Sequence, residues 1–221
     1  SGVTVDLEAP TLTKVEVSST NTNTQGQLEQ LAKEGDTITQ TVESSEALKS
    51  LSVMGSDGSQ TPLTAVANTG REWTLSDTVD SDDSGELSFT LAYEDLAGNA
   101  GISVSDTINN SRVSFDTTVP TLSSVSLASN NVSTNRAKSG DNLTLSFTSS
   151  EPIPAPTVTL AGSTITATSG NGTDWQAVHP VANNTPNGSA SFSISFVDEA
   201  GNVGTAVTTT TDQSSVNVDT K

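Results

Sequence analysis

An internal repeat constrains this chain more than any other feature. The run DLAGNAG at 95–101 recurs as DEAGNVG at 198–204, an offset of 103 residues, and VSFDTT at 113–118 returns as VNVDT at 216–220. The pairs Gly-Asp at 35–36 and Ser-Glu at 45–46 recur 105 residues later. A period of this length in 221 residues predicts two domains of ordinary size, 1–115 and 116–219, with 219–221 beginning a further copy.

Tandem arrays of this kind usually act as extended spacers rather than as enzymes, because each copy is one structural unit stacked on the next. The chain begins at Ser1-Gly2 without an initiator Met, which we interpret as an excised piece of a longer protein.

Alternating apolar and polar residues predict an all-β fold. Segments such as LTLSFT at 143–148 and FSISF at 192–196 alternate strictly and are separated by Gly- and Asn-rich turns. About seven strands per repeat, with turn signals every 8 to 12 residues, indicate two tandem immunoglobulin-like Greek-key β-sandwiches. In the second repeat the expected strands are 121–128, 142–148, 157–160, 164–167, 174–178, 190–197 and 205–210. In the first, Leu28 to Lys33 is the one segment that suggests a turn of helix.

The composition indicates a thin core. Hydrophobic residues make up only 32% of the chain and aromatic residues 4%, so Val, Ile, Leu and Thr must fill most of each interior. Trp73 and Trp175 occupy corresponding positions in the two repeats and are expected to anchor the cores. The absence of cysteine excludes disulfides, thiolate metal sites and cysteine nucleophiles.

The formal net charge of −18 limits the partners of the chain. So acidic a surface repels nucleic acid and anionic membranes, whereas cations are its natural counterpart. No apolar run is long enough to span a bilayer, and no signal peptide is present. We therefore expect no nucleic-acid binding and no direct membrane insertion.

Acidic residues far apart in sequence are expected to meet at one pole of each sandwich. Successive strands run up and down, so the loops after the second and sixth strands lie beside the segment that leads into the domain. Those three places carry Asp116, Glu151, Asp198 and Asn202 in the second repeat, and Asp6, Glu46, Asp95 and Asn99 in the first. Such oxygen ligands suit Ca²⁺. The alternative is that Asp-x-Ala-Gly-Asn is simply a good turn, since Gly and Asn tolerate positive φ.

A second acidic cluster occurs only in the first repeat, at 80–86. It resembles the first half of a helix-loop-helix calcium loop, but Leu91 stands where the final Glu is required. Together with Asp36, Asp82 of this cluster offers ligands for a metal at the junction with the second repeat. The alternative is an ordinary solvated acidic loop.

Several motifs resemble the bacterial immunoglobulin-like repeats of very large repeats-in-toxin and biofilm-associated surface adhesins. They are DTTVP at 116–120, GDNLTL at 140–145, SEPI at 150–153, FVDEAGN at 196–202 and VNVDT at 216–220. The resemblance implies a monomeric, extracellular extender on the bacterial cell surface, whose partners are the neighbouring repeats of the same chain. It also implies that Ca²⁺ stiffens the domain junctions through Asp116, Glu151, Asp198 and Asn202. The first repeat departs from the pattern, with DLEAP at 6–10 and insertions near 25–34, 56–61 and 106–111.

Two functions follow from these patterns. The first is a structural spacer that projects a distal binding tip, and the alternative is a recognition module that grips glycan or protein with the enlarged loops of the first repeat. An enzyme is not expected, because His179 is the sole histidine and no nucleophile and base can be paired.

Overall fold

The structure is a computed structural model that describes residues 5–24, 26–55, 60–62, 64–65 and 70–221. The chain divides into two compact units, Ser1–Thr117 and Thr118–Lys221. Every regular element among the described residues is a β-strand, and none of them belongs to a helix long and apolar enough to cross a membrane. Of the insertions expected in the first repeat, Gln25 and residues 56–59 lie outside the described residues.

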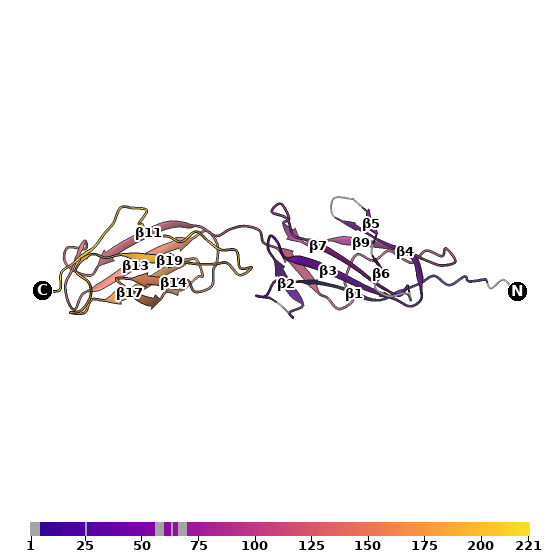
Figure 1. The fold of residues 1–221 in the computed structure, drawn as a ribbon, viewed down its shortest axis with the longest axis horizontal. Coiled ribbons are helices and arrows are strands. Elements are labelled where there is room, and N and C mark those ends of the chain that lie inside the picture. The colour runs from indigo at the N-terminus through magenta and orange to yellow at the C-terminus, as the bar shows by residue number, and fades with distance from the viewer. Residues whose placement is uncertain (1–4, 25, 56–59, 63, 66–69) are drawn as a thin grey trace. The chain divides into compact units, whose positions relative to one another are not determined.

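The larger sheet of each unit is built around a strand whose side chains alternate strictly between buried and half-buried, residues 37–44 in the first unit and 142–149 in the second. In the first unit β1 (Leu12–Ser19), β3 (Thr37–Ser44), β7 (Glu72–Thr78) and β6 (Thr64–Ala65) lie side by side in that order (Figure 1). In the second unit the same order is taken by β11 (Leu122–Ser129), β13 (Asn142–Ser149), β17 (Asp174–Pro180) and β16 (Thr168–Ser169). All these pairs are antiparallel. The period-2 pattern therefore places one face of each sheet toward the core.

A second antiparallel sheet faces the first in each unit. It consists of β5 (Gln60–Pro62), β4 (Leu48–Gly55) and β9 (Phe89–Asp95) in the first unit, and of β15 (Ser163–Thr166), β14 (Thr157–Leu160) and β19 (Phe192–Ser195) in the second. A small third sheet joins β2 (Glu29–Ala32), β10 (Arg112–Phe115) and β8 (Gly85–Glu86), and its counterpart joins β12 (Arg136–Ala137), β20 (Asn217–Val218) and β18 (Gly188–Ser189). The two units thus share one strand order.

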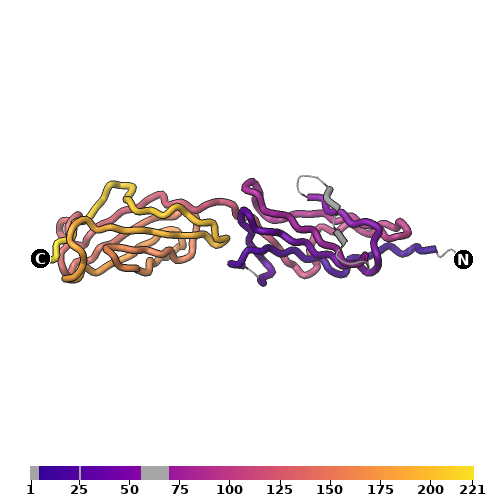
Figure 2. The backbone as a smooth tube through the Cα atoms, viewed as in Figure 1, coloured from indigo at the N-terminus to yellow at the C-terminus, as the bar shows by residue number. Residues whose placement is uncertain are grey.

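The strand expected at 205–210 is not regular in the structure. Val207 forms an isolated bridge with Ile194 of β19, and Thr211 then donates its backbone N–H to Val125 of β11 at 2.9 Å. The segment therefore passes from one sheet to the other and divides its hydrogen bonds between them (Figure 2). A residue run that changes sheets cannot form a continuous ladder, which is why the prediction of a strand was wrong here.

The turn of helix suggested for Leu28 to Lys33 is also wrong, because residues 29–32 form strand β2. They pair in parallel with β10, with Glu29 opposite Arg112 and Ala32 opposite Phe115. Ala32 is fully buried. Tertiary pairing and burial override the weak helical preference of this short segment.

The cores of the two units differ. In the second unit 19 buried residues form one continuous cluster, whereas the buried residues that the structure describes in the first unit, from which the side chains of 56–69 are excluded, form two smaller clusters. Trp73 and Trp175 are buried, and each indole N–H donates to a glycine carbonyl three residues earlier, at 3.0 and 3.1 Å. This confirms the two tryptophans as core anchors.

Candidate metal centre

Each Asp-x-Ala-Gly-Asn motif forms a tight turn whose carboxylate is fixed by the last residue of the motif. Asp95 ends β9, and the left-handed conformation of Gly98 (φ 92°) closes the turn. Asn99 donates its backbone N–H to one Asp95 carboxylate oxygen at 2.8 Å and its side-chain amide to the other at 2.7 Å. Asn202 holds Asp198 in the same way, with both bonds at 2.8 Å. The motif is therefore both a turn and a device that orients a buried carboxylate.

The Ser-Glu loop is brought to this turn by strand register. Ser44 ends β3, its hydroxyl donates to the backbone carbonyl of Glu46, and Leu48 then pairs with Asp95 at the start of β4. In the second unit the Ser149 hydroxyl donates to the carbonyl of Glu151 at 2.6 Å. Both glutamates are half-buried.

The segment that leads into each sandwich completes the arrangement. Ser45 donates its backbone N–H to the Thr11 carbonyl at 2.8 Å, which places the start of β1 beside the Ser-Glu loop. Asp6 lies ahead of this contact, and its backbone carbonyl accepts a hydrogen bond from the Asn99 amide at 3.3 Å. One carboxylate oxygen from each of Asp6, Glu46 and Asp95 lies within 4.8 Å of the others.

The second group repeats this geometry. Ser150 donates its backbone N–H to the carbonyl of Thr121, just before β11, at 2.8 Å. Carboxylate oxygens of Asp116, Glu151 and Asp198 again lie within 4.8 Å of one another. Asp198 is buried, while Asp116 and Glu151 are half-buried. The structure thus brings together eight of the residues singled out in the sequence, six carboxylates and two supporting asparagines.

In the first group the pKa values of Glu46 and Asp95 shift in opposite directions. Burial, and then the nearby carboxylates of Asp6, Asp95 and Glu8, raise the pKa of Glu46. Burial alone would also raise the pKa of Asp95, but hydrogen bonds from the Asn99 side chain and from the backbone of the turn lower it. Hydrogen bonds therefore favour the anion of Asp95, whereas burial and the neighbouring carboxylates disfavour that of Glu46. Sequence reasoning missed Glu8, although it stands two residues after Asp6 and donates its backbone N–H to that side chain at 3.2 Å.

The two groups fit a calcium ion by spacing and by donor chemistry. Oxygens bound to one Ca²⁺ at about 2.3 to 2.6 Å lie at most about 4.6 to 5.2 Å apart, and the carboxylates of each group already meet this limit. Three carboxylates with an asparagine beside them form the hard oxygen set that Ca²⁺ prefers. In the second group Asp116, Glu151 and Asp198 would hold the ion, with Asn202 orienting Asp198.

The remaining two candidates, Asp36 and Asp82, belong to neither convergent group of the described residues. One oxygen of Asp36 accepts hydrogen bonds from the Asn21 amide at 2.8 Å and from the backbone N–H of Lys33 at 2.9 Å. Asp82 is exposed in the loop before β8.

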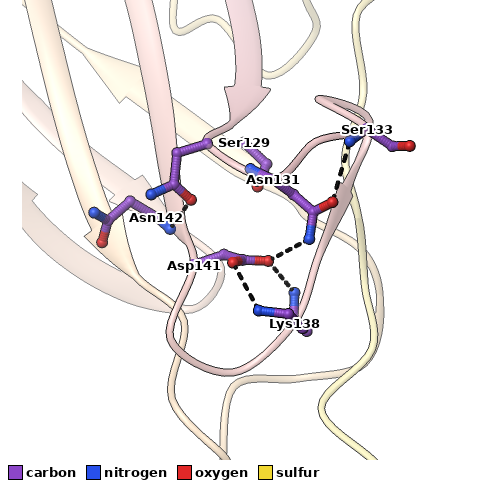
Figure 3. A network of polar contacts seen from close by, with 7 residues as sticks. Ser129, Asn131, Ser133, Lys138, Asp141 and Asn142 are labelled. Atoms are coloured by element: carbon purple, nitrogen blue, oxygen red, sulfur yellow. Dashed lines mark hydrogen bonds and ion pairs between the residues drawn. The ribbon is translucent and has the colours of Figure 1, made fainter.

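The second unit has the same turn, built around Asp141. Figure 3 shows its carboxylate accepting from the Asn131 amide at 2.8 Å and from the backbone N–H of Lys138 at 2.8 Å, with the Lys138 ammonium at 3.2 Å (Figure 3). The Gly-Asp pair repeated in the sequence is thus a turn whose aspartate bonds the chain around it.

No protein-family model and no curated protein matches this sequence. Among solved structures, a variant of a titin fragment of three immunoglobulin domains is similar, at 13% identity and a TM-score of 0.54 over 98% of this chain and 67% of the fragment. A bacterial ice-binding adhesin of 1.5 MDa is 20% identical over 94% of this chain and 64% of that structure, with a TM-score of 0.48. A Ca²⁺-stabilised adhesin that helps an Antarctic bacterium bind ice is also 20% identical, over 96% and 50%, with a TM-score of 0.48. The likeness to titin shows that the chain folds as two immunoglobulin-like β-sandwiches.

Proposed function

We propose that this chain is a spacer segment of a large bacterial surface adhesin, in which Ca²⁺ stiffens tandem immunoglobulin-like units so that they project a distal binding tip. The observation that carries the proposal is the recurrence of one carboxylate triad. In each sequence repeat an aspartate from the leading segment, a glutamate from the Ser-Glu loop and an asparagine-held aspartate converge within 4.8 Å.

A divalent ion would act at these triads by joining three separate stretches of backbone. The leading segment before β1 or β11 supplies Asp6 or Asp116, and the sandwich loops supply the other ligands. Without a cation the carboxylates repel one another, and this repulsion adds to burial in raising the pKa of Glu46. With Ca²⁺ bound, the leading segment becomes attached to the loops, and its freedom to swing decreases. Absence of cysteine suits this role, because a bound ion can provide the cross-link that a disulfide provides elsewhere.

Calcium titration by isothermal calorimetry tests the proposal directly. The chain should bind two Ca²⁺ ions, Glu46→Gln and Glu151→Gln should each remove one of them, and Glu46→Gln/Glu151→Gln should remove both. Asp106→Asn is the matched control, since Asp106 is an exposed carboxylate outside both triads. A wild-type chain that binds no Ca²⁺ at millimolar concentration, or variants that still bind two ions, would contradict the metal assignment.

Small-angle scattering tests the spacer role separately from metal binding. We expect Ca²⁺ to narrow the distribution of maximum dimensions, and a chelator to broaden it again. If calorimetry shows two ions while scattering stays unchanged, calcium stabilises the units without stiffening the chain, and the spacer mechanism is wrong.

A further inference from the structure

The two units differ at a core position that the repeat places in register. Gln40 of β3 and Leu145 of β13 stand 105 residues apart and occupy the same place, since Gln40 pairs with Leu75 of β7 and Leu145 with Ala177 of β17. Leu145 is fully buried inside the continuous core of the second unit. Gln40 is 5% exposed and belongs to neither of the two core clusters of the first unit.

A second difference between the repeats lies on the facing sheet, where a leucine of the second unit corresponds to a glycine of the first. Gly55 pairs with Phe89 at the end of β4, and Leu160, also 105 residues later, pairs with Phe192 at the end of β14. Leu160 is fully buried, whereas Gly55 has no side chain to place there. Two leucines that fill the second unit are thus replaced by a polar residue and by no side chain in the first.

Gln40 and Gly55 both line a cleft of about 550 Å³ in the first unit. Its apolar walls come from both sides, with Ile38, Leu75 and Val79 on one and Val53 and Phe89 on the other. Phe115 of β10 and Leu87 also contribute. A space of this size and lining accommodates a small organic ligand.

Gln40 lines this cleft, and its amide nitrogen Nε2 is buried without a hydrogen-bond partner. It is the single buried side-chain nitrogen or oxygen of the described residues in that state. Buried polar groups are almost always satisfied, because an unmade hydrogen bond is costly in a medium that excludes water. The unpaired amide therefore calls for a hydrogen-bond acceptor that the protein itself does not supply.

The rim of the cleft is acidic. Asp77, Asp82, Asp83 and Glu86 line it, and no lysine or arginine does. Asp83 uses one oxygen to accept the backbone N–H of Asp80 at 2.8 Å, and Glu86 pairs with Arg112 at 2.7 Å. A ligand that enters past these carboxylates is favoured if it carries a positive charge.

We propose that this cleft binds a small cationic amphiphile, a molecule with an apolar stem, an ammonium group at one end and a hydrogen-bond acceptor at the other. The stem lies between the sheets, the ammonium group lies at the rim carboxylates, and the acceptor meets the Gln40 amide after this side chain turns toward the cleft, because its buried Nε2 does not face the open space in the present position. Because the cleft shares no residue with the two carboxylate triads, this inference is independent of the calcium proposal.

Three probes with the same six-carbon stem separate the contributions. Aminohexanol carries the stem, the acceptor and the cation, hexylamine lacks the acceptor, and hexanediol lacks the cation. Titrated into the intact chain in the presence of a chelator and followed by NMR, aminohexanol should bind saturably and shift the Gln40 amide and the Phe89 and Phe115 rings. Each of the other two should bind about five- to tenfold more weakly, the effect of losing one polar interaction.

Variants connect the binding to the cleft. Gln40→Leu restores the residue of the second unit, removes the amide and should weaken aminohexanol to the affinity of hexylamine, whereas Gln176→Leu, an exposed glutamine on β17, should leave binding unchanged. Asp82→Asn/Asp83→Asn should reduce aminohexanol to the affinity of hexanediol, and Asp106→Asn should not. The proposal is overturned if no probe binds saturably, if the three probes bind equally, or if Gln40→Leu binds aminohexanol as tightly as the wild type does.

Discussion

The second glycine of the repeated motif packs so closely against an aromatic ring that no side chain fits at its position. A Cβ on Gly204 would lie 2.1 Å from the ring of Phe196, and one on Gly101 would lie 2.0 Å from the ring of Tyr93. Gly204 therefore lets the chain pass directly under a buried aromatic side chain. The sequence shows the glycine repeated beside the Asp-x-Ala-Gly-Asn turn, but its reason depends on a partner eight residues away across an isolated bridge.

We expect Gly204→Ala to destabilise the second unit by about 1 to 3 kcal/mol, because the added methyl must displace a packed ring. Chemical denaturation followed by tryptophan fluorescence measures the change. Gly170→Ala is the control, since a Cβ at Gly170 meets nothing within 4 Å. Equal stability of the two variants would show that Phe196 can move away without cost.

A reciprocal exchange at the Gln40 position tests why the first core is divided. Gln40→Leu should stabilise the first unit by about 1 to 3 kcal/mol, because it removes an unsatisfied buried amide and fills space between the sheets. Leu145→Gln should destabilise the second unit by at least as much, since it places an amide in a closed apolar core. Thermal unfolding of both variants gives the comparison, and changes of the same sign would contradict it.

Single strands were predictable where alternation is strict. The expected 157–160 has the bounds of β14, and the expected 142–148 differs from β13 by one residue. Prediction was wrong where pairing across the fold decides, at β2 and at the segment through Val207. The residues of the acidic triads could be predicted from the sequence, because the order of the loops in an immunoglobulin-like sandwich places them at one pole. The 105-residue offset aligns Gln40 with Leu145 and Gly55 with Leu160 in the sequence, but only the structure shows that Gln40 and Gly55 line a cleft.

The turn between β12 and β13 should make the second unit sensitive to acid. Hydrogen bonds from the Asn131 amide and the Lys138 backbone lower the pKa of Asp141 below its usual 3.8, although its burial opposes the shift. A carboxyl whose pKa is lower in the folded state stabilises that state above about pH 4, and this contribution disappears as the pH falls through the folded-state pKa.

Asp141→Asn should therefore be less stable than the wild type at pH 7, and the two should converge as the pH approaches 2. Urea denaturation at a series of pH values measures the difference. A gap between the two proteins that stays constant with pH would mean that the charge of Asp141 does not contribute to the stability of the turn.

At the scale of the whole chain, the acidic excess and the two triads lead us to expect that Ca²⁺ increases stability. A ligand that binds only the folded state adds about 2.7 kcal/mol when its free concentration is 100 times its Kd. We expect Ca²⁺ to raise both melting temperatures, and Glu46→Gln to remove the increase for the first unit alone. The same variant should melt higher than the wild type in chelator, because it removes the charge whose pKa its neighbours raise. Differential scanning calorimetry in Ca²⁺ and in chelator distinguishes these effects from general salt screening, for which NaCl of equal ionic strength is the control.

The parallel pairing of β10 with β2 has a mechanical consequence for the first unit. The chain leaves the first unit after Phe115, at the end of the sheet where β3 begins at Thr37. It enters the unit at the opposite end, where Asp6 lies near Glu46. Tension applied to the two ends of the unit therefore runs along the strands and loads the β10–β2 ladder in shear. Four residues of β10 must separate from four of β2 together rather than peel away one at a time. We therefore expect the first unit to unfold at a higher pulling force than a sandwich whose terminal strand can be peeled away one residue at a time.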